Sequence, residues 1–238
     1  MAVVASDIFF RTFKDCINDL VQGISVDTNS SDPATTNAVH VISKQLHGNF
    51  GRLQYAIKVI QARLCEDAVW ATSTAVTVYE LLAMSIDPAF PHPDPQMPAD
   101  FSGAIVVRDQ LMRACQAQFQ QTMAMREWSR GLITFLGQLC TIGNTTSTTP
   151  GVVLHIIDGM MTSTSLTTGE NFDIFVGFMM RAGPFFDSHV GIQEHLTARM
   201  ERLKDRARGL GMTESLAIYG ILQLRQKGWR VDEMECVV

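Results

Sequence analysis

Residues 105–119 read IVVRDQLMRACQAQF, and the spacing of their apolar side chains decides the fold class of the chain. Leu111, Cys115 and Phe119 follow one another by four positions each, and Met112 follows Ile105 by seven positions. Side chains spaced by three, four or seven residues lie on one face of an α-helix. The stretch therefore predicts a helix that buries one apolar face.

The same helical spacing recurs along almost the whole chain. We expect nine or ten helices of ordinary length, joined by short connections. Besides 105–119, the predicted helical segments are 7–23, 33–48, 53–64, 69–82, 132–143, 152–161, 172–183, 192–208 and 213–227. No stretch shows the alternation of apolar and polar residues that indicates a half-buried strand. The sequence therefore predicts an all-α fold.

Two helical architectures are compatible with this spacing. Pairs of helices repeat at roughly 40 residues, which is typical of an α-solenoid built from helical repeats. A compact helical bundle would show the same apolar periodicity, and the sequence contains no identical repeats that would exclude it. The spacing alone leaves both architectures open.

Several segments interrupt the helical pattern. Five of the eight prolines lie between residues 87 and 100, a density that excludes a helix or a central strand and predicts a surface loop. Polar segments at 26–32 and 144–150 are predicted as connections, and Gly183 with Pro184 is predicted to close a helix. The expected division is an N-terminal helix and linker at 1–32, a helical domain at 33–231, and an acidic tail at 232–238.

Composition excludes several classes of protein. Of the 238 residues, 46% are hydrophobic and 18% are charged, which excludes a disordered chain, and the net charge of −5 excludes a globally basic nucleic-acid coat. Five cysteines without a C-x-x-C pair argue against a disulfide framework or a zinc site. The first seven residues contain no basic side chain, and the apolar stretch 68–86 contains Glu80. We therefore expect neither a signal peptide nor a membrane span, and a cytoplasmic protein.

No pattern of residues points to catalysis. The sequence contains no H-E-x-x-H, no phosphate-binding glycine motif and no G-x-S-x-G, and its six histidines are not spaced as a metal site on one helix face. We expect no catalytic residue, no metal and no cofactor. The 13 methionines could form an adaptable binding surface, but core filling is the favoured interpretation.

The distribution of charge is more informative than its total. Residues 199–230 hold eight basic and three acidic side chains, which gives this segment +5 and leaves −10 for the remainder. One interpretation is a solvated helix face with ion pairs between neighbouring turns. The other is a basic surface that contacts RNA or an acidic partner. The candidate RNA-binding residues are Arg199, Arg202, Arg206, Arg208, Lys227 and Arg230.

Three stretches, in order, resemble the signature segments of one family. Residues 111–119, LMRACQAQF, resemble Leu-Leu-x-x-Cys-Gln-x-x-Phe; residues 129–139, SRGLITFLGQL, resemble Ser-Leu-Gly-Asn-Ile-x-Phe-Ile-Gly-Glu-Leu. Residues 222–229, LQLRQKGW, are similar to Leu-Asp-Leu-Arg-x-x-x-Trp. These are segments of the middle domain of eukaryotic translation initiation factor 4G, and the resemblance covers about residues 34–231.

The resemblance implies a fold and a function. The family fold is a solenoid of five antiparallel HEAT-type helix pairs, beside which the helix at 7–23 and the proline-rich loop are additions. Family members are scaffolds without chemistry of their own. They bind a DEAD-box RNA helicase of the initiation factor 4A type, hold its two lobes half-open, associate with other translation initiation factors and contact RNA.

The resemblance also suggests where a helicase would bind, which is at turns and helix ends along one edge. The partner-binding residues expected here are His47, Asn49, Phe101, Arg113, Arg130, Arg225 and Trp229. Arginine and tryptophan are favoured interface anchors. A different interpretation of Trp229 is a hydrophobic plug that closes the last helical repeat.

The sequence departs from the family at two places. Leu132 stands where the family has asparagine, and the last helix begins with residues 213–216, TESL, where the family usually has arginines. Two alternatives therefore stay open. One is a sister scaffold of the same domain family in mRNA decay, deadenylation or nuclear cap binding. The other, from a different class, is an α-helical enzyme or small-ligand binder.

Overall fold

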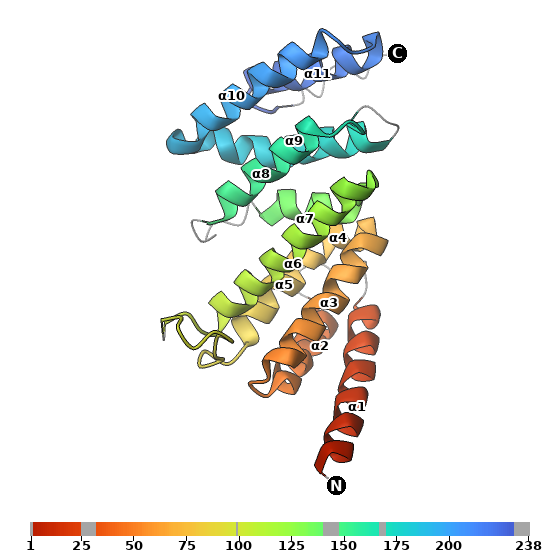
Figure 1. The fold of residues 1–238 in the computed structure, drawn as a ribbon, viewed down its shortest axis with the longest axis vertical. Coiled ribbons are helices and arrows are strands. Elements are labelled where there is room, and N and C mark those ends of the chain that lie inside the picture. The colour runs from red at the N-terminus through yellow and green to blue at the C-terminus, as the bar shows by residue number, and fades with distance from the viewer. Residues whose placement is uncertain (1, 25–31, 99, 140–147, 167–169, 231–238) are drawn as a thin grey trace. The chain divides into compact units, whose positions relative to one another are not determined.

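The structure is a computed structural model, and it describes residues 2–24, 32–98, 100–139, 148–166 and 170–230. Within these residues it contains eleven α-helices and no strand, which confirms the predicted all-α class (Figure 1). By its contacts the chain divides into two compact units, Met1–Gln118 and Phe119–Val238. The boundary lies within the sixth helix.

Unit 1 contains the first five helices and most of the sixth. Their bounds are α1 (Ala2–Gly23), α2 (Pro33–Leu46), α3 (Phe50–Glu66), α4 (Ala68–Ser73), α5 (Ala75–Ser85) and α6 (Ala104–Met125). Helix α3 packs on α1, α2 and α4, and α2 packs on α5. Of the stripe predicted in residues 105–119, Leu111, Cys115 and Phe119 are buried and form the inner face of α6, whereas Ile105 and Met112 are only half-buried.

Capping residues in the sequence explain where α2 and α3 begin and end. The Asp32 carboxylate accepts a hydrogen bond of 3.0 Å from the Thr35 N–H, and Pro33 occupies the first turn of α2. His47 ends α2 in the left-handed conformation, with φ of 47°. The Asn49 side chain then accepts from the Arg52 N–H at 3.1 Å and starts α3. A turn of three residues therefore joins two helices.

The prediction of one helix over residues 69–82 is wrong, because the segment forms two helices that meet at Thr74. The Thr72 and Ser73 hydroxyls donate to the carbonyls of Ala68 and Val69, four residues back. Hydroxyl groups that hydrogen-bond to carbonyls of the preceding turn often bend helices. The backbone of Thr74 leaves the helical region with φ of −121°, and α5 starts at the next residue.

The proline-rich segment leaves the helical fold between α5 and α6. Its base is fixed, because the Gly103 N–H donates to the Phe90 carbonyl and the Ser102 hydroxyl donates to the Pro88 carbonyl, each at 2.9 Å. Gly103 has φ of +56°, and a Cβ there would lie 2.9 Å from the Pro88 backbone. A side chain at residue 103 would therefore disrupt the base of the loop.

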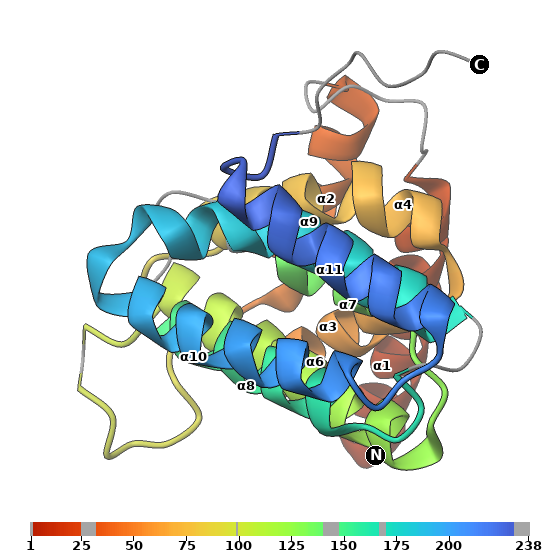
Figure 2. The same ribbon diagram turned by 90° about the horizontal axis from the view of Figure 1, so that it is seen from above.

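Unit 2 contains the last seven residues of α6 and five further helices. Their bounds are α7 (Arg130–Leu139), α8 (Thr148–Thr162), α9 (Glu170–Ser188), α10 (Val190–Ala207) and α11 (Met212–Gln226). Helix α7 is buried along almost its whole length and packs mainly on α9. Helices α10 and α11 lie side by side (Figure 2), and both pack on α9.

Two predicted helix boundaries in unit 2 differ from the structure. Gly183 and Pro184 do not close α9, which continues through them to Ser188. An internal proline destabilises a helix by about 3 kcal/mol. Here the extra turn buries Phe186 completely, which offsets part of that loss. The predicted connection at 144–150 falls partly outside the described residues, and its last three residues already belong to α8.

Candidate partner-binding surfaces

The turn between α2 and α3 presents two of the candidate residues at the surface of unit 1. His47 and Asn49 are both exposed, and both also shape the turn, His47 through its positive φ and Asn49 as the cap of α3. Gly48 between them also has a positive φ, of 68°. The turn is therefore held in one conformation by local hydrogen bonds, which favours a defined surface.

Phe101 and Arg113 are the other candidates in unit 1. Phe101 is partly exposed, and its ring stands edge-on to His92 with 5.2 Å between the centroids. The Arg113 side chain is 64% exposed and forms an ion pair of 2.8 Å with Asp109, one helical turn earlier on α6. An exposed pair of this kind adds little to stability. Arg113 can therefore exchange this contact for one with a partner.

Arg130 is the exposed candidate of unit 2, at the first residue of α7. Its Nε donates to Glu170 Oε1 at 2.8 Å, and both side chains are largely exposed. The pair joins the start of α7 to the start of α9. Its geometry resembles that of Arg113, an accessible cation held loosely by one carboxylate.

Arg225 and Trp229 have a different environment, because Asp187 of α9 binds both. Arg225 donates from Nε to both carboxylate oxygens, at 3.1 and 3.0 Å, and from Nη2 to Oδ1 at 2.8 Å. The Trp229 indole N–H donates to Oδ2 at 2.7 Å, and Arg225 Nη2 also donates to the Thr197 hydroxyl at 2.8 Å. We call these four residues the Asp187 cluster.

The Trp229 ring in this cluster is packed inside unit 2. The side chain is 8% exposed, and its ring lies so close to Gly183 that a Cβ there would stand 2.3 Å from it. Trp229 has φ of 63°, and its N–H donates to the Leu224 carbonyl at 2.7 Å, so the chain turns back under α11. These contacts favour the hydrophobic plug over an exposed interface anchor.

Three of the six candidate RNA-binding residues, all of them arginines, contact α8 or the residues after it. Arg199 and Arg202 of α10 both form ion pairs with Asp158. Arg206 donates to the carbonyls of Met161 and Ser163, so it caps the end of α8. These arginines join α10 to α8, and their guanidinium groups bind a carboxylate or carbonyl groups within unit 2.

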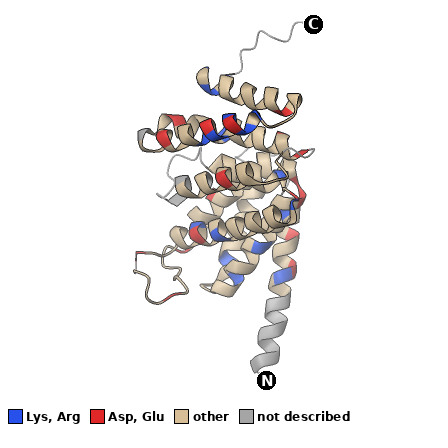
Figure 3. Cartoon of the chain, turned by 45° about the horizontal axis from the view of Figure 1, so that its top comes forward, with Lys and Arg blue, Asp and Glu red and all other residues tan. Residues whose placement is uncertain are grey.

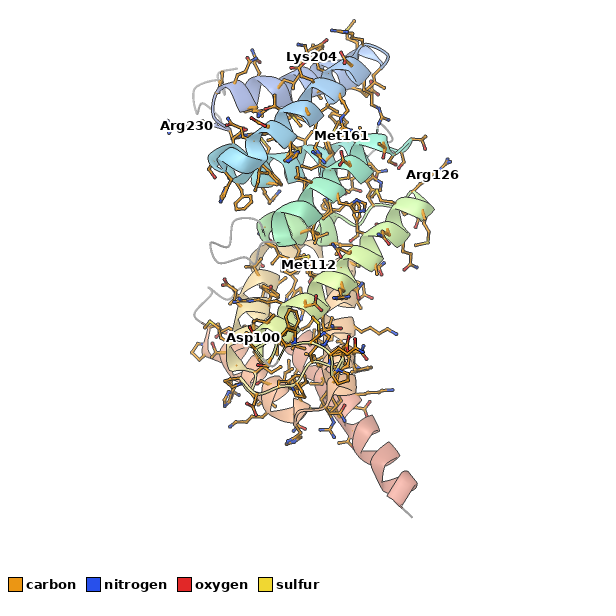
Figure 4. All side chains as sticks on the ribbon, turned by 60° about the vertical axis from the view of Figure 1, so that its left-hand side comes forward. Asp100, Met112, Arg126, Met161, Lys204 and Arg230 are labelled. Carbon is orange, nitrogen blue, oxygen red and sulfur yellow. The ribbon has the colours of Figure 1, made fainter. Side chains whose placement is uncertain are left out.

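The remaining basic side chains of this region are exposed or half-buried. Arg208 pairs with Asp205, and Lys204 pairs with Glu201, each one turn away on α10. Figure 3 shows the resulting mixture of basic and acidic positions along α10. Lys227 and Arg230 are exposed at the end of α11, and Figure 4 labels Arg230 beyond its last turn. Both interpretations of the basic segment therefore describe part of it.

The groups with shifted pKa values are core residues. Burial raises the pKa of the Cys115 thiol and that of the Tyr79 hydroxyl, each to about 12. Burial also lowers the pKa of Arg63, a shift that Asp67 partly opposes. In each case desolvation of the charged form is the largest cause. These shifts result mainly from burial. In many active sites, by contrast, a specific charged partner close to the group contributes to the shift.

Two absences hold for the part of the chain that the structure describes. No group of three or more His, Cys, Asp or Glu side chains is arranged to hold a metal ion in these residues. None of the helices searched there combines the length and the apolar character needed to cross a membrane.

The structure brings together only some of the predicted residues. It joins His47 with Asn49 in one turn, and Arg225 with Trp229 in the Asp187 cluster. The sequence did not reveal two carboxylates that bind predicted residues. Asp187 binds Arg225 and Trp229, and Asp158 binds Arg199 and Arg202. Each lies about 40 positions from its partners, and a single sequence contains no local pattern that links such distant residues.

Comparison with known proteins gives no relatives. No protein-family model matches the chain, and neither a curated protein nor a solved structure matches it.

Proposed function

We propose that this chain is a helical scaffold of the initiation factor 4G middle-domain type, which binds a DEAD-box RNA helicase and stimulates it. The observation that carries the proposal is the occurrence of three signature-like segments in the family order, at 111–119, 129–139 and 222–229. A single short segment of this kind would be weak support, but three in order are more specific.

The positions of these segments are compatible with a shared fold. The apolar residues of the first two line the inner faces of α6 and α7, and Arg225 and Trp229 of the third join α11 to α9. Short turns connect α2 to α3 and α10 to α11, as expected for antiparallel pairs in a HEAT-type solenoid. The segments therefore support the proposal mainly through core packing, and less through the binding surface.

The helicase contacts are assigned to the exposed candidates. In unit 1 these are His47, Asn49, Phe101 and Arg113, and in unit 2 the exposed candidate is Arg130. A scaffold that binds both lobes of a helicase changes their opening and closing only through different affinities for the two arrangements. Contacts on separate parts of the chain would supply such a difference. Contact with RNA through Arg202, Arg208, Lys227 and Arg230 is part of the same proposal.

The test is a calorimetric titration of the chain with the initiation factor 4A helicase of the same organism, with ATPase rates measured in parallel. We expect binding together with a raised ATPase rate. Arg113→Ala and Arg130→Ala should each weaken binding, while leaving the helical content unchanged. Lys58→Ala is the matched control, because Lys58 is an exposed cation on α3 outside the assigned set.

Two outcomes would contradict the proposal. A folded chain that fails to bind this helicase would redirect it to the sister scaffolds, and helicases of mRNA decay would be titrated next. Binding that Arg113→Ala, Arg130→Ala and Lys58→Ala leave equally unchanged would refute the assigned surface. The pair Arg225→Ala and Trp229→Ala is a poor test, because both side chains support the fold of unit 2.

A further inference from the structure

Two arginines of α10 share one carboxylate of α8 inside unit 2. Arg199 Nη2 donates to Asp158 Oδ2, and Arg202 Nη2 donates to Asp158 Oδ1 at 3.1 Å. Each carboxylate oxygen therefore receives one guanidinium group. Asp158 is the only acidic residue in the sequence of α8, so a single negative charge from that helix faces two positive charges.

The two arginines differ in how firmly they are held. The Arg199 side chain is 14% exposed, and its Nη1 also donates to the His195 carbonyl at 3.0 Å. Its Nε is buried and has no hydrogen-bond partner among the described residues, so a donor remains at this position. The Arg202 side chain is 57% exposed, and an ion pair with so much exposure is easily exchanged. Arg202 can therefore leave Asp158 for another anion.

The surroundings of these two arginines are basic. Residues 199–208 hold five basic and two acidic side chains, and the two acidic ones already pair with Lys204 and Arg208. When Asp158 is counted with them, five basic against three acidic side chains leave a net charge of +2. An anion that approaches this group is therefore attracted, although Asp158 opposes it.

A phosphodiester group has the chemistry that such a site accepts. Like a carboxylate, it carries one negative charge spread over two oxygens, and arginine binds both groups through its guanidinium N–H donors. We propose that Arg199 and Arg202 form a phosphate-binding site for single-stranded RNA, and that Asp158 occupies this site and limits RNA binding. This inference rests on the RNA contact in the proposed function, and it adds the location of that contact and the residue that restrains it.

The first test removes the charge of Asp158. The probe is a fluorescein-labelled single-stranded oligouridine, which is titrated with the full chain and followed by fluorescence anisotropy. We expect Asp158→Asn to tighten RNA binding by about threefold, which is the effect expected from a partly exposed ion pair. Asp158→Ser removes the same charge and should give the same gain. Asp173→Asn is the matched control, because it removes a charge from an exposed position of α9 and should leave the affinity nearly unchanged.

The second test identifies the arginine that is released. In the Asp158→Asn chain, Arg202→Gln should abolish the gain in affinity. Lys204→Gln removes the same charge from the same helix and should keep most of the gain. One additional phosphate contact to single-stranded RNA steepens the plot of log K against log salt concentration by about 0.7. The slope for Asp158→Asn should therefore exceed that of the parent chain by about 0.7.

Several outcomes would overturn the inference. One is equal affinity of the parent chain and Asp158→Asn when circular dichroism shows both to be folded. Another is equal tightening by Asp158→Asn and Asp173→Asn, which would reflect net charge alone. A third is an equal loss from Arg202→Gln and Lys204→Gln. Loss of the gain when sodium phosphate replaces chloride at constant ionic strength would assign the site to free phosphate instead of RNA.

Failure of the inference and failure of the proposed function give different results. If neither the parent chain nor Asp158→Asn binds the RNA at millimolar concentration, the RNA contact is refuted and this inference with it. Helicase binding is measured in its own titration and is unaffected by that result. If both chains bind RNA equally, the RNA contact stands, and only the restraint by Asp158 is refuted.

Discussion

Each unit uses an arginine and a tryptophan to hold its helices together, but the two arginines have different partners. In unit 1, Arg63 of α3 donates to the Val21 carbonyl of α1, and its guanidinium lies 4.6 Å from the centre of the Trp70 ring. In unit 2, Arg225 binds the Asp187 carboxylate, which also accepts from the Trp229 indole.

The difference lies in what remains when one group is removed. Loss of Arg63 leaves a carbonyl without this donor and a ring face without its cation. Loss of Arg225 leaves a partly buried carboxylate whose other donor is the Trp229 indole N–H. An uncompensated buried charge is much more destabilising than an unpaired neutral group. Both units therefore use an arginine beside a tryptophan, but removal of the arginine should destabilise unit 2 more than unit 1.

The largest effect is expected for Trp229→Ala. It removes the ring that packs on Gly183 and the indole N–H that binds Asp187, so unit 2 should lose about 3–5 kcal/mol of unfolding free energy. Urea denaturation followed by circular dichroism measures this loss. Trp229→Phe keeps a ring and removes the N–H, and it should have a smaller effect. Equal stability of Trp229→Ala and the parent chain would refute the packed role of this residue.

A direct comparison of the two arginines comes next. Arg225→Met should cost about 2–4 kcal/mol, because the Asp187 carboxylate remains beside a side chain that cannot pair with it. Arg63→Met should cost only about 1–2 kcal/mol, because methionine can fill the space and only the Val21 carbonyl loses a donor. The same denaturation curves measure both values. A larger effect at Arg63 would reverse the comparison between the units.

The Asp187 cluster also shows where sequence reasoning ends. Periodicity predicted the all-α class and the inner face of α6, since these depend on residues three and four positions apart. It could not predict that α9 continues through Pro184, because the gain comes from burying Phe186. Nor could it identify Asp187, because the contact between α9 and α11 exists only in the folded chain.

The candidate binding residues also differ in whether local sequence could place them. The sequence placed His47 and Asn49 in an exposed turn, because short polar turns between helices have local signals such as glycine and asparagine. It placed Trp229 among possible anchors, because tryptophan is typical of both interfaces and cores. Only burial distinguishes the two roles, and burial depends on the opposing helix.

High pH should destabilise unit 1 through two buried acids. Burial raises the pKa of Tyr79 and of Cys115 to about 12, from ordinary values of 10.0 and 9.0. Their stabilising effect is fully present below about pH 9 and is lost as the pH rises through 12, because the unfolded chain releases these protons first. Urea curves at pH 8 and pH 10.5 measure the fall. Tyr79→Phe with Cys115→Val should show a shallower fall, and an equal slope would contradict this assignment.

The smallest effect is expected at the surface of α6. Arg113→Ala removes an ion pair with Asp109 whose arginine is 64% exposed, so the unfolding free energy should change by about 0.5 kcal/mol or less. The same substitution should weaken helicase binding, because a side chain that contributes little to folding can make its contribution at an interface. Denaturation and titration of one variant therefore separate the two roles. A loss of stability comparable to that of Arg225→Met would place Arg113 among the structural arginines and remove it from the proposed surface.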